Sequence, residues 1–97
     1  MRIRGFDWDE TNRRKTEEHD LDPESVEGLF AGNDLVVVRH PSKRERYLAL
    51  GFVPDGRFVV VVFDYDPETH WVRVVTAYEP TSPRWWQQYT RLVRKRH

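Results

Sequence analysis

Three arginines in strand-like segments have the chemistry to hold a phosphate group. Arg46, Arg57 and Arg73 each lie in or beside a stretch rich in valine, leucine, phenylalanine or tyrosine, and a guanidinium group binds phosphate bidentately while it stays charged. Cleavage of a phosphodiester without a metal also requires groups that transfer protons. The candidates for that role are His40, Tyr47 and Tyr78. We therefore take Arg46, Arg73, Tyr78 and His40 as candidate catalytic residues and Arg57 as a candidate substrate contact.

Each arginine also has a purely structural interpretation. Arg57 directly follows a glycine and fits a solvated turn residue, and Arg46 and Arg73 fit surface ion pairs with aspartate or glutamate. The two-residue period of a strand places Arg73 on the same face as Val75 and opposite its immediate neighbours. Arg73 is therefore expected to point away from the main core.

The proton-transfer candidates have structural alternatives too. His40 precedes a proline at a strand end, where an exposed loop histidine is the ordinary outcome, and Tyr78 fits a core or interface residue. Asn12 and His19 lie on one side of the first predicted helix, and we interpret them as capping or bridging the first two helices rather than as catalytic.

The C-terminal segment combines aromatic rings with arginines. Trp85 and Trp86 are adjacent, and neighbouring helical positions are about 100° apart, so both rings cannot face the core squarely. We expect one ring to meet a partner protein, with stacking on a nucleotide as the alternative. Arg84 and Arg91 beside these rings are candidate substrate-binding residues.

Composition limits the kind of protein. The 97 residues allow one domain, taken as 1–97, and the absence of cysteine excludes disulfides and thiolate metal sites. The four histidines have no ligand-like spacing, so we expect no metal and no cofactor. The longest apolar run, residues 59–63, is far too short to cross a bilayer, so no membrane association and a cytoplasmic location are expected.

The net charge of zero conceals an uneven distribution. Residues 7–34 hold ten acids and three bases, whereas residues 80–97 hold five bases and no acid. Residues 35–63 carry five bases and two acids. One face of the protein is therefore expected to attract a polyanion and another to repel it.

The pattern of caps, turns and apolar runs predicts an α+β domain. Asp9 is placed to cap a helix that runs to about residue 18, and Asp22 followed by Pro23 begins a second short helix. Four strands follow at residues 35–39, 45–53, 57–65 and 71–78, with a tight turn at residues 54–56. Ser82 and Pro83 begin a last helix that is expected to dock on an antiparallel sheet.

Several of these segments, in this order, resemble one family. The matching segments are Phe6-Asp7-Trp8-Asp9, Asn12, His19, Asp22-Pro23-Glu24-Ser25-Val26, Arg46-Tyr47-Leu48-Ala49-Leu50-Gly51, Gly56-Arg57-Phe58-Val59-Val60-Val61-Val62-Phe63 and Val72-Arg73-Val74-Val75-Thr76-Ala77. Over residues 6–79 the chain is similar to BrnT-like toxins of the RelE/ParE superfamily. The resemblance implies a RelE-like fold, metal-independent RNA cleavage that inhibits translation, and neutralisation by a cognate antitoxin.

The resemblance also frames the alternatives. Tyr78 stands where relatives commonly carry an arginine, and residues 83–88 replace a charged segment, which permits a non-catalytic protein-interaction module with the same fold. A gyrase-directed toxin is a third interpretation, although no residue favours it. The expected partners are the antitoxin and RNA, either free or on the ribosome, and a homodimer within the toxin–antitoxin complex is compatible with the sequence.

Overall fold

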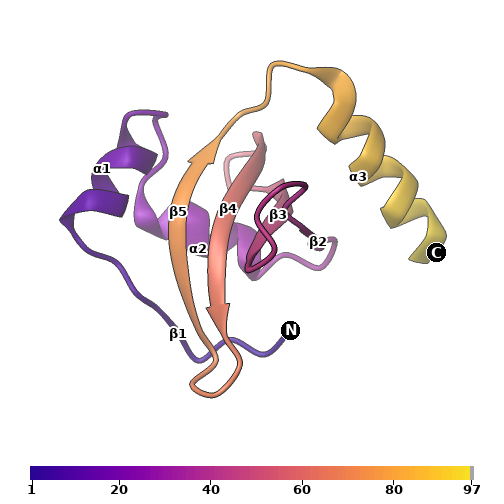
Figure 1. The fold of residues 1–97 in the computed structure, drawn as a ribbon. Coiled ribbons are helices and arrows are strands. Elements are labelled where there is room, and N and C mark those ends of the chain that lie inside the picture. The colour runs from indigo at the N-terminus through magenta and orange to yellow at the C-terminus, as the bar shows by residue number, and fades with distance from the viewer. Residues whose placement is uncertain (97) are drawn as a thin grey trace.

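The computed structural model describes residues 1–96 and arranges them as three helices and one sheet (Figure 1). The elements in chain order are β1 (Gly5–Phe6), α1 (Glu10–Glu17), α2 (Pro23–Phe30), β2 (Val36–Arg39), β3 (Arg46–Phe52), β4 (Phe58–Asp66), β5 (Trp71–Tyr78) and α3 (Pro83–Arg96). The predicted α+β class, the two short N-terminal helices and the C-terminal helix are confirmed.

Capping side chains fix where the helices begin. Asp9 accepts a hydrogen bond from the backbone N–H of Asn12, and the Asn12 side chain accepts one from the backbone N–H of Asp9, which completes a capping box. Asp22 accepts from the N–H of Ser25 at the start of α2, where proline is the first helical residue. The predicted starts of both helices are confirmed.

The sheet has five strands in the order β1-β5-β4-β3-β2. Strands β2 to β5 pair antiparallel with their sequence neighbours, as predicted, whereas β1 pairs parallel with β5. The prediction of about four strands thus missed β1. Two residues are too short for a recognisable pattern. Backbone bonds flank the pairing of β1 with β5, from Arg4 N–H to the His70 carbonyl (2.8 Å) and from Asp7 N–H to the Val72 carbonyl (2.7 Å).

Helices cover both faces of the sheet. On one face α2 packs over a buried cluster that includes Leu29, Val61 and Phe63, and on the other α3 packs over Leu48, Leu50 and Val60. Helix α1 lies against β5 at the edge of the sheet. Figure 1 shows α1 and α3 on opposite sides of the sheet, with α3 leaning away from β4 and β5. Because α3 packs on β2 and β3, the end of the face where β4 finishes and β5 begins is left for other contacts.

A β-bulge changes the phase of β5. Phe63 pairs with Val74 and Val62 pairs with Thr76, so Val75 is an extra residue on β5. Before the bulge Val74 is buried in the cluster beneath α2, and after it Ala77 is buried in the same cluster. Among the described residues, no helix combines the length and apolar character needed to cross a membrane.

Candidate active site

The strand register brings three of the four candidate catalytic residues to one place. Arg46 on β3 pairs with Asp64 on β4, and Asp64 pairs in turn with Arg73 on β5. His40 continues the line beyond β2, because its N–H donates to the Arg46 carbonyl at 2.9 Å. Directly opposed residues project from the same face of a sheet. His40, Arg46, Asp64 and Arg73 therefore form one continuous set, which we call the polar row.

Helix α1 closes one side of the polar row. A cavity of about 150 Å³ is lined by Thr11, Asn12, Lys15, Arg46, Asp64, Arg73, Val74 and Val75. Lys15 adds a second kind of cation, a compact ammonium group, to the two guanidinium groups. Polar residues on one side of α1, among them Asn12 and Lys15, thus line this cavity instead of packing on the core.

Asn12 holds α1 at the edge of the sheet. The side chain is 2% exposed, and its Nδ2 donates to the carbonyls of Asp7 and Val74, both at 2.9 Å. The structural interpretation of Asn12 is therefore confirmed as a cap, although the bridge runs from α1 to β5 rather than to α2. His19 lies elsewhere, with its ring centroid 6.3 Å from that of Tyr78.

Both arginines of the polar row contact carboxylates. Arg46 Nε lies 3.3 Å from Asp64 Oδ1, and the Arg73 Nη atoms contact Asp7 at 3.3 Å and Asp9 at 2.5 Å. The backbone N–H of Asn12 and the Arg73 guanidinium hold the pKa of the Asp9 carboxyl below its ordinary value of 3.8, and Asp9 raises the pKa of Arg73. The ion-pair interpretation of these arginines is thus realised in the structure.

The ion pairs of the polar row leave some hydrogen-bonding groups of Arg46 and Asp64 without a partner among the described residues. Arg46 approaches Asp64 only through Nε, and its two Nη groups make no hydrogen bond or ion pair with a described residue. Asp64 Oδ1 is buried and, within residues 1–96, accepts no well-aligned hydrogen bond. The contact between Asp64 and Arg46 is therefore electrostatic, and the hydrogen-bond acceptor Asp64 Oδ1 lies beside the Arg46 Nη donors without a bond between them.

His40 is held in one tautomer by its own loop. Its Nδ1 accepts from the backbone N–H groups of Ser42 at 3.2 Å and Lys43 at 3.1 Å. A nitrogen that accepts these bonds carries no proton, so the proton of the neutral ring is on Nε2. His40 thus presents a hydrogen-bond donor beside Arg46.

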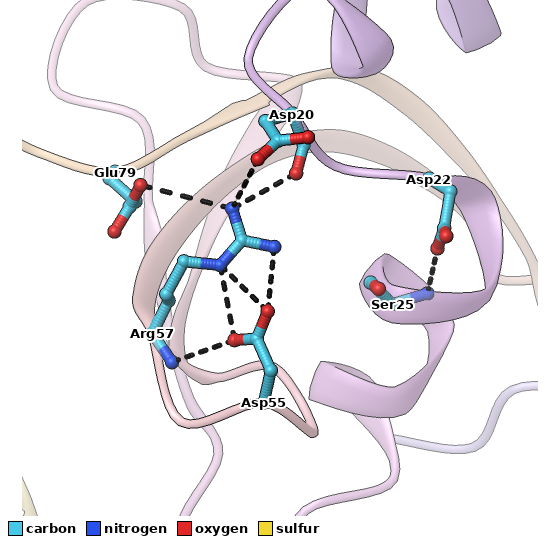
Figure 2. Close-up of polar contacts among 6 residues, drawn as sticks. All are labelled: Asp20, Asp22, Ser25, Asp55, Arg57 and Glu79. Atoms are coloured by element: carbon cyan, nitrogen blue, oxygen red, sulfur yellow. Dashed lines mark hydrogen bonds and ion pairs between the residues drawn. The ribbon is translucent and has the colours of Figure 1, made fainter.

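Arg57 lies at the other end of the sheet and is enclosed by acids (Figure 2). Its guanidinium binds Asp55 through Nε and Nη2 at 2.9–3.0 Å, donates from Nη1 to the Asp20 carbonyl at 2.9 Å, and has Glu79 at 3.8 Å. Asp55 raises the pKa of Arg57. A strand rise of about 3.3 Å per residue separates Arg57 from Asp64 by roughly 20 Å, so the two ends cannot share one phosphate.

The two candidate tyrosines are also outside the polar row. Tyr78 ends β5, roughly 15 Å from Arg73 by strand rise, and packs under α3. Tyr47 packs against the buried cluster beneath α2, where its ring stacks on Phe63 with centroids 5.6 Å apart. Of the proton-transfer candidates, only His40 lies in the polar row, where it is opposite Arg46.

Helix α3 carries cations without carboxylate partners among the described residues. Arg84 lies over the Trp85 ring at 4.7 Å, and Arg91 is exposed. Trp85 is half-buried in the cluster beneath α3, whereas Trp86 is 44% exposed and contacts Phe52, Phe58 and Tyr89. As expected from their adjacency, one ring faces the core and the other faces solvent.

Sequence reasoning missed Asp64 and the place of Lys15 in the wall of the cavity. Alternation along β4 places Asp64 on the face of Val62, but its position between two arginines follows from the register of three strands. Within residues 1–96, no three histidine or acidic side chains are grouped so that they could hold a metal ion.

Comparisons with known proteins give one match. A family model described as the BrnT ribonuclease toxin of type II toxin–antitoxin systems matches residues 8–82, which include the whole polar row. No curated protein matches the chain.

Proposed function

We propose, from the premise that this chain belongs to the BrnT family of ribonuclease toxins of type II toxin–antitoxin systems, that it cleaves RNA at the polar row. One observation carries the proposal: two guanidinium groups stand on either side of one carboxylate, in register across three strands, at the wall of a cavity. Cleavage of RNA by its own 2′-hydroxyl needs this combination of an acceptor and positive charge at one phosphate.

The arginines supply the charge. Arg46 offers two unengaged Nη groups, and Arg73 reaches the phosphate by exchanging its contact with Asp7 for one with a phosphate oxygen. His40 offers the Nε2 proton to a phosphate oxygen. Negative charge that develops on the phosphorane is thereby stabilised by groups that are already in place.

Asp64 is the group placed to accept the proton of the 2′-hydroxyl. As that proton moves to the Asp64 carboxylate, the 2′-oxygen forms a bond to phosphorus. The bond from phosphorus to the 5′-oxygen breaks with its electron pair on that oxygen, which takes a proton from water. The products are a 2′,3′-cyclic phosphate and a 5′-hydroxyl, and no step requires a metal. Tyr78 and Arg57 are too distant to take part in this step.

The proposal is tested in cells by inducing the protein without a partner in a bacterial host. We expect growth arrest with loss of RNA and of protein synthesis, and we expect an Arg46→Ala/Arg73→Ala variant to abolish all three. Arg13→Ala/Arg14→Ala removes two exposed positive charges from α1, outside the polar row, and serves as the charge-matched control. It should remain toxic.

Purified protein tests the chemistry. Single-stranded RNA should be cut in the presence of a chelator and leave cyclic phosphate ends, whereas fully 2′-O-methylated RNA should stay intact. Asp64→Asn should lower the cleavage rate by about 10²- to 10⁴-fold. Cleavage of the methylated RNA, or loss of cleavage with the chelator, would exclude this mechanism.

We assign the antitoxin to the aromatic surface formed by Phe52, Phe58 and Trp86, which pack on the buried Tyr89. Aromatic residues with large exposed rings are common anchors of protein interfaces, and Phe52 and Trp86 are 42% and 44% exposed. Trp86→Ala should weaken co-purification with the protein encoded by the neighbouring gene by about 30-fold or more in affinity. Unchanged affinity would remove this surface from the interface.

A non-catalytic interaction module is the second candidate function. It is favoured by the ion pairs that already engage Arg46 and Arg73, because a structural role explains these pairs without any substrate. Normal growth and intact RNA, from protein shown to be folded, would select this second function.

A further inference from the structure

A second cavity adjoins the polar row on its far side. Its volume is about 340 Å³, and it shares Asp64 and Arg73 with the first cavity. The other lining residues are Asp7, Tyr65, Asp66, Thr69 and Trp71. Arg73 therefore separates a small cavity with Arg46 and Lys15 from a larger cavity with an indole ring in its wall.

The Trp71 ring is fixed in place by a glycine. Trp71 pairs with Gly5 of β1, and a Cβ added to Gly5 would lie only 2.9–3.1 Å from three atoms of the indole ring. The ring thus rests directly on the Gly5 backbone, where no other residue type leaves room for it. Trp71 is nevertheless 46% exposed, so contact with Gly5 buries only part of the ring.

The spacing of Trp71 and Arg73 matches one nucleotide. The two residues are separated by one position in a regularly paired part of β5, so they share a face and lie about 6.6 Å apart. A phosphate at Arg73 would place its own sugar and base within reach of Trp71. Bases of single-stranded RNA bind proteins largely by stacking on exposed aromatic rings.

We infer that the 340 Å³ cavity is a subsite for an unpaired RNA base, which stacks on Trp71 while Arg73 holds the adjoining phosphate. This inference rests on the proposed function, since it assumes that RNA binds at the polar row. It adds a binding residue that none of the site candidates includes, and it explains why an exposed tryptophan lies beside the catalytic arginine.

The carboxylates in the cavity are compatible with a base. Asp7 contacts Arg73, Asp64 contacts Arg46, and Asp66 Oδ1 accepts from the backbone N–H groups of Glu68 and Thr69. Their remaining oxygens are hydrogen-bond acceptors. Acceptors suit the amino groups of adenine, cytosine and guanine, whereas uracil has no amino group and presents two carbonyl oxygens on either side of one ring N–H. The cavity is thus expected to bind uracil least well.

Two other interpretations of Trp71 are distinguishable. The ring covers an edge glycine, which alone stabilises a sheet, and acidic side chains around an aromatic ring also suit a cationic side chain of a partner protein. The first predicts that Trp71 affects folding and not RNA affinity. The second predicts that a basic peptide, and not RNA, loses affinity when the ring is removed.

The test is a thermodynamic cycle that combines removal of the Trp71 ring with removal of one RNA base and measures binding affinity. Short 2′-O-methyl oligonucleotides, which the proposed mechanism cannot cut, are compared by fluorescence anisotropy with copies that carry one abasic position, scanned along the strand. Trp71→Ala should weaken binding by about 5- to 150-fold, the range for one base stacked on an aromatic ring. Trp71→Phe should retain most of the affinity.

The cycle has a specific expected outcome. At one abasic position the native protein should lose as much affinity as Trp71→Ala loses with intact RNA, and combining both changes should add little further loss. Uracil at that position should bind more weakly than the other bases. Additive losses at every position, or uracil as the preferred base, would overturn the inference.

Gly5→Ala provides a second perturbation that leaves the indole present. Its Cβ would displace the ring, so affinity should fall toward that of Trp71→Ala while circular dichroism shows a folded protein. If folded Trp71→Ala protein bound RNA as tightly as the native protein, the inference of a base subsite would be overturned. If Trp71→Ala lost affinity for an arginine-rich peptide but not for RNA, the cavity would be a binding site for a protein partner. A different result would indicate that the proposed function itself is wrong. In that case RNA would bind the Arg46→Ala/Arg73→Ala variant as tightly as the native protein.

Discussion

Replacing Asn12 with alanine should destabilise the fold strongly, although the residue is a small polar one on a short helix. Its side chain accepts from Asp9 N–H at 2.8 Å and donates to the Asp7 and Val74 carbonyls, both at 2.9 Å. Three hydrogen bonds at about 1 kcal/mol each give a loss of about 3 kcal/mol. The Val74 carbonyl loses this side-chain donor in a buried place, which adds about 1–2 kcal/mol.

The opposing effect is smaller. Alanine is the better helix former, by about 0.6 kcal/mol, so a net loss of about 3–4 kcal/mol is expected. A single domain has a total stability of about 5–15 kcal/mol, and the loss is therefore a large share of it. With a urea dependence of about 2 kcal/mol per molar, the unfolding midpoint should fall by about 1.5–2 M.

Urea unfolding followed by circular dichroism and tryptophan fluorescence measures this loss. Thr11→Ala changes the exposed neighbour in the same turn and should stay within about 0.5 kcal/mol of the native protein. Asn12→Asp keeps the acceptor for Asp9 N–H but loses the donor to both carbonyls, so it should be at least as destabilised as the alanine variant. A change below about 1 kcal/mol for Asn12→Ala would refute the argument that these bonds anchor α1 to β5.

Three further predictions follow from other parts of the structure. The Arg57 guanidinium holds the pKa of the Asp55 carboxyl below its ordinary value of 3.8, so the stabilisation from this pair is complete above about pH 4 and is lost as the pH falls through the lowered pKa. The free energy of unfolding, measured with urea, should therefore fall less steeply below about pH 4 in Asp55→Asn than in the native protein, and an equal fall would contradict this. A Cβ on Gly28 would lie 2.6 Å from Pro54 Cγ, and overpacking of about 1–3 kcal/mol should outweigh a helix-propensity gain of about 1 kcal/mol; a higher melting temperature for Gly28→Ala would be the contrary result. Arg91 has no carboxylate partner among the described residues, so Arg91→Ala should reduce the slope of log affinity for single-stranded RNA against log salt by about 0.7, whereas an unchanged slope would place Arg91 outside the RNA contact.

The local parts of the fold were predictable because their signals are local. Asp9 and Asp22 fix helix starts by hydrogen bonds that span three residues, and Gly56, with φ of 97°, marks the turn between β3 and β4. Strand β1 gave no such signal, since its partner β5 lies far along the chain. Pairing between distant segments is decided by packing, which no short window contains.

The same distinction applies to the candidate site. The residue types identified His40, Arg46 and Arg73, and the register then placed them together. Residue type alone grouped Arg57 and Tyr78 with them, whereas the strand length separates the two sets. Asp64 was overlooked because it is unremarkable within β4; its significance depends on which residues lie opposite it.

The bulge at Val75 affects how insertions and deletions can be accommodated. Val75 is the extra residue of the bulge, so removing it would restore a regular ladder and leave every later residue of β5 opposite its present partner and on its present face. Ala77 would stay in the packed layer beneath α2, and Tyr78 would stay in the layer beneath α3. A relative with one residue fewer here should therefore keep the same small and large positions after the gap, so the gap in an alignment of distant members of the fold belongs at Val75.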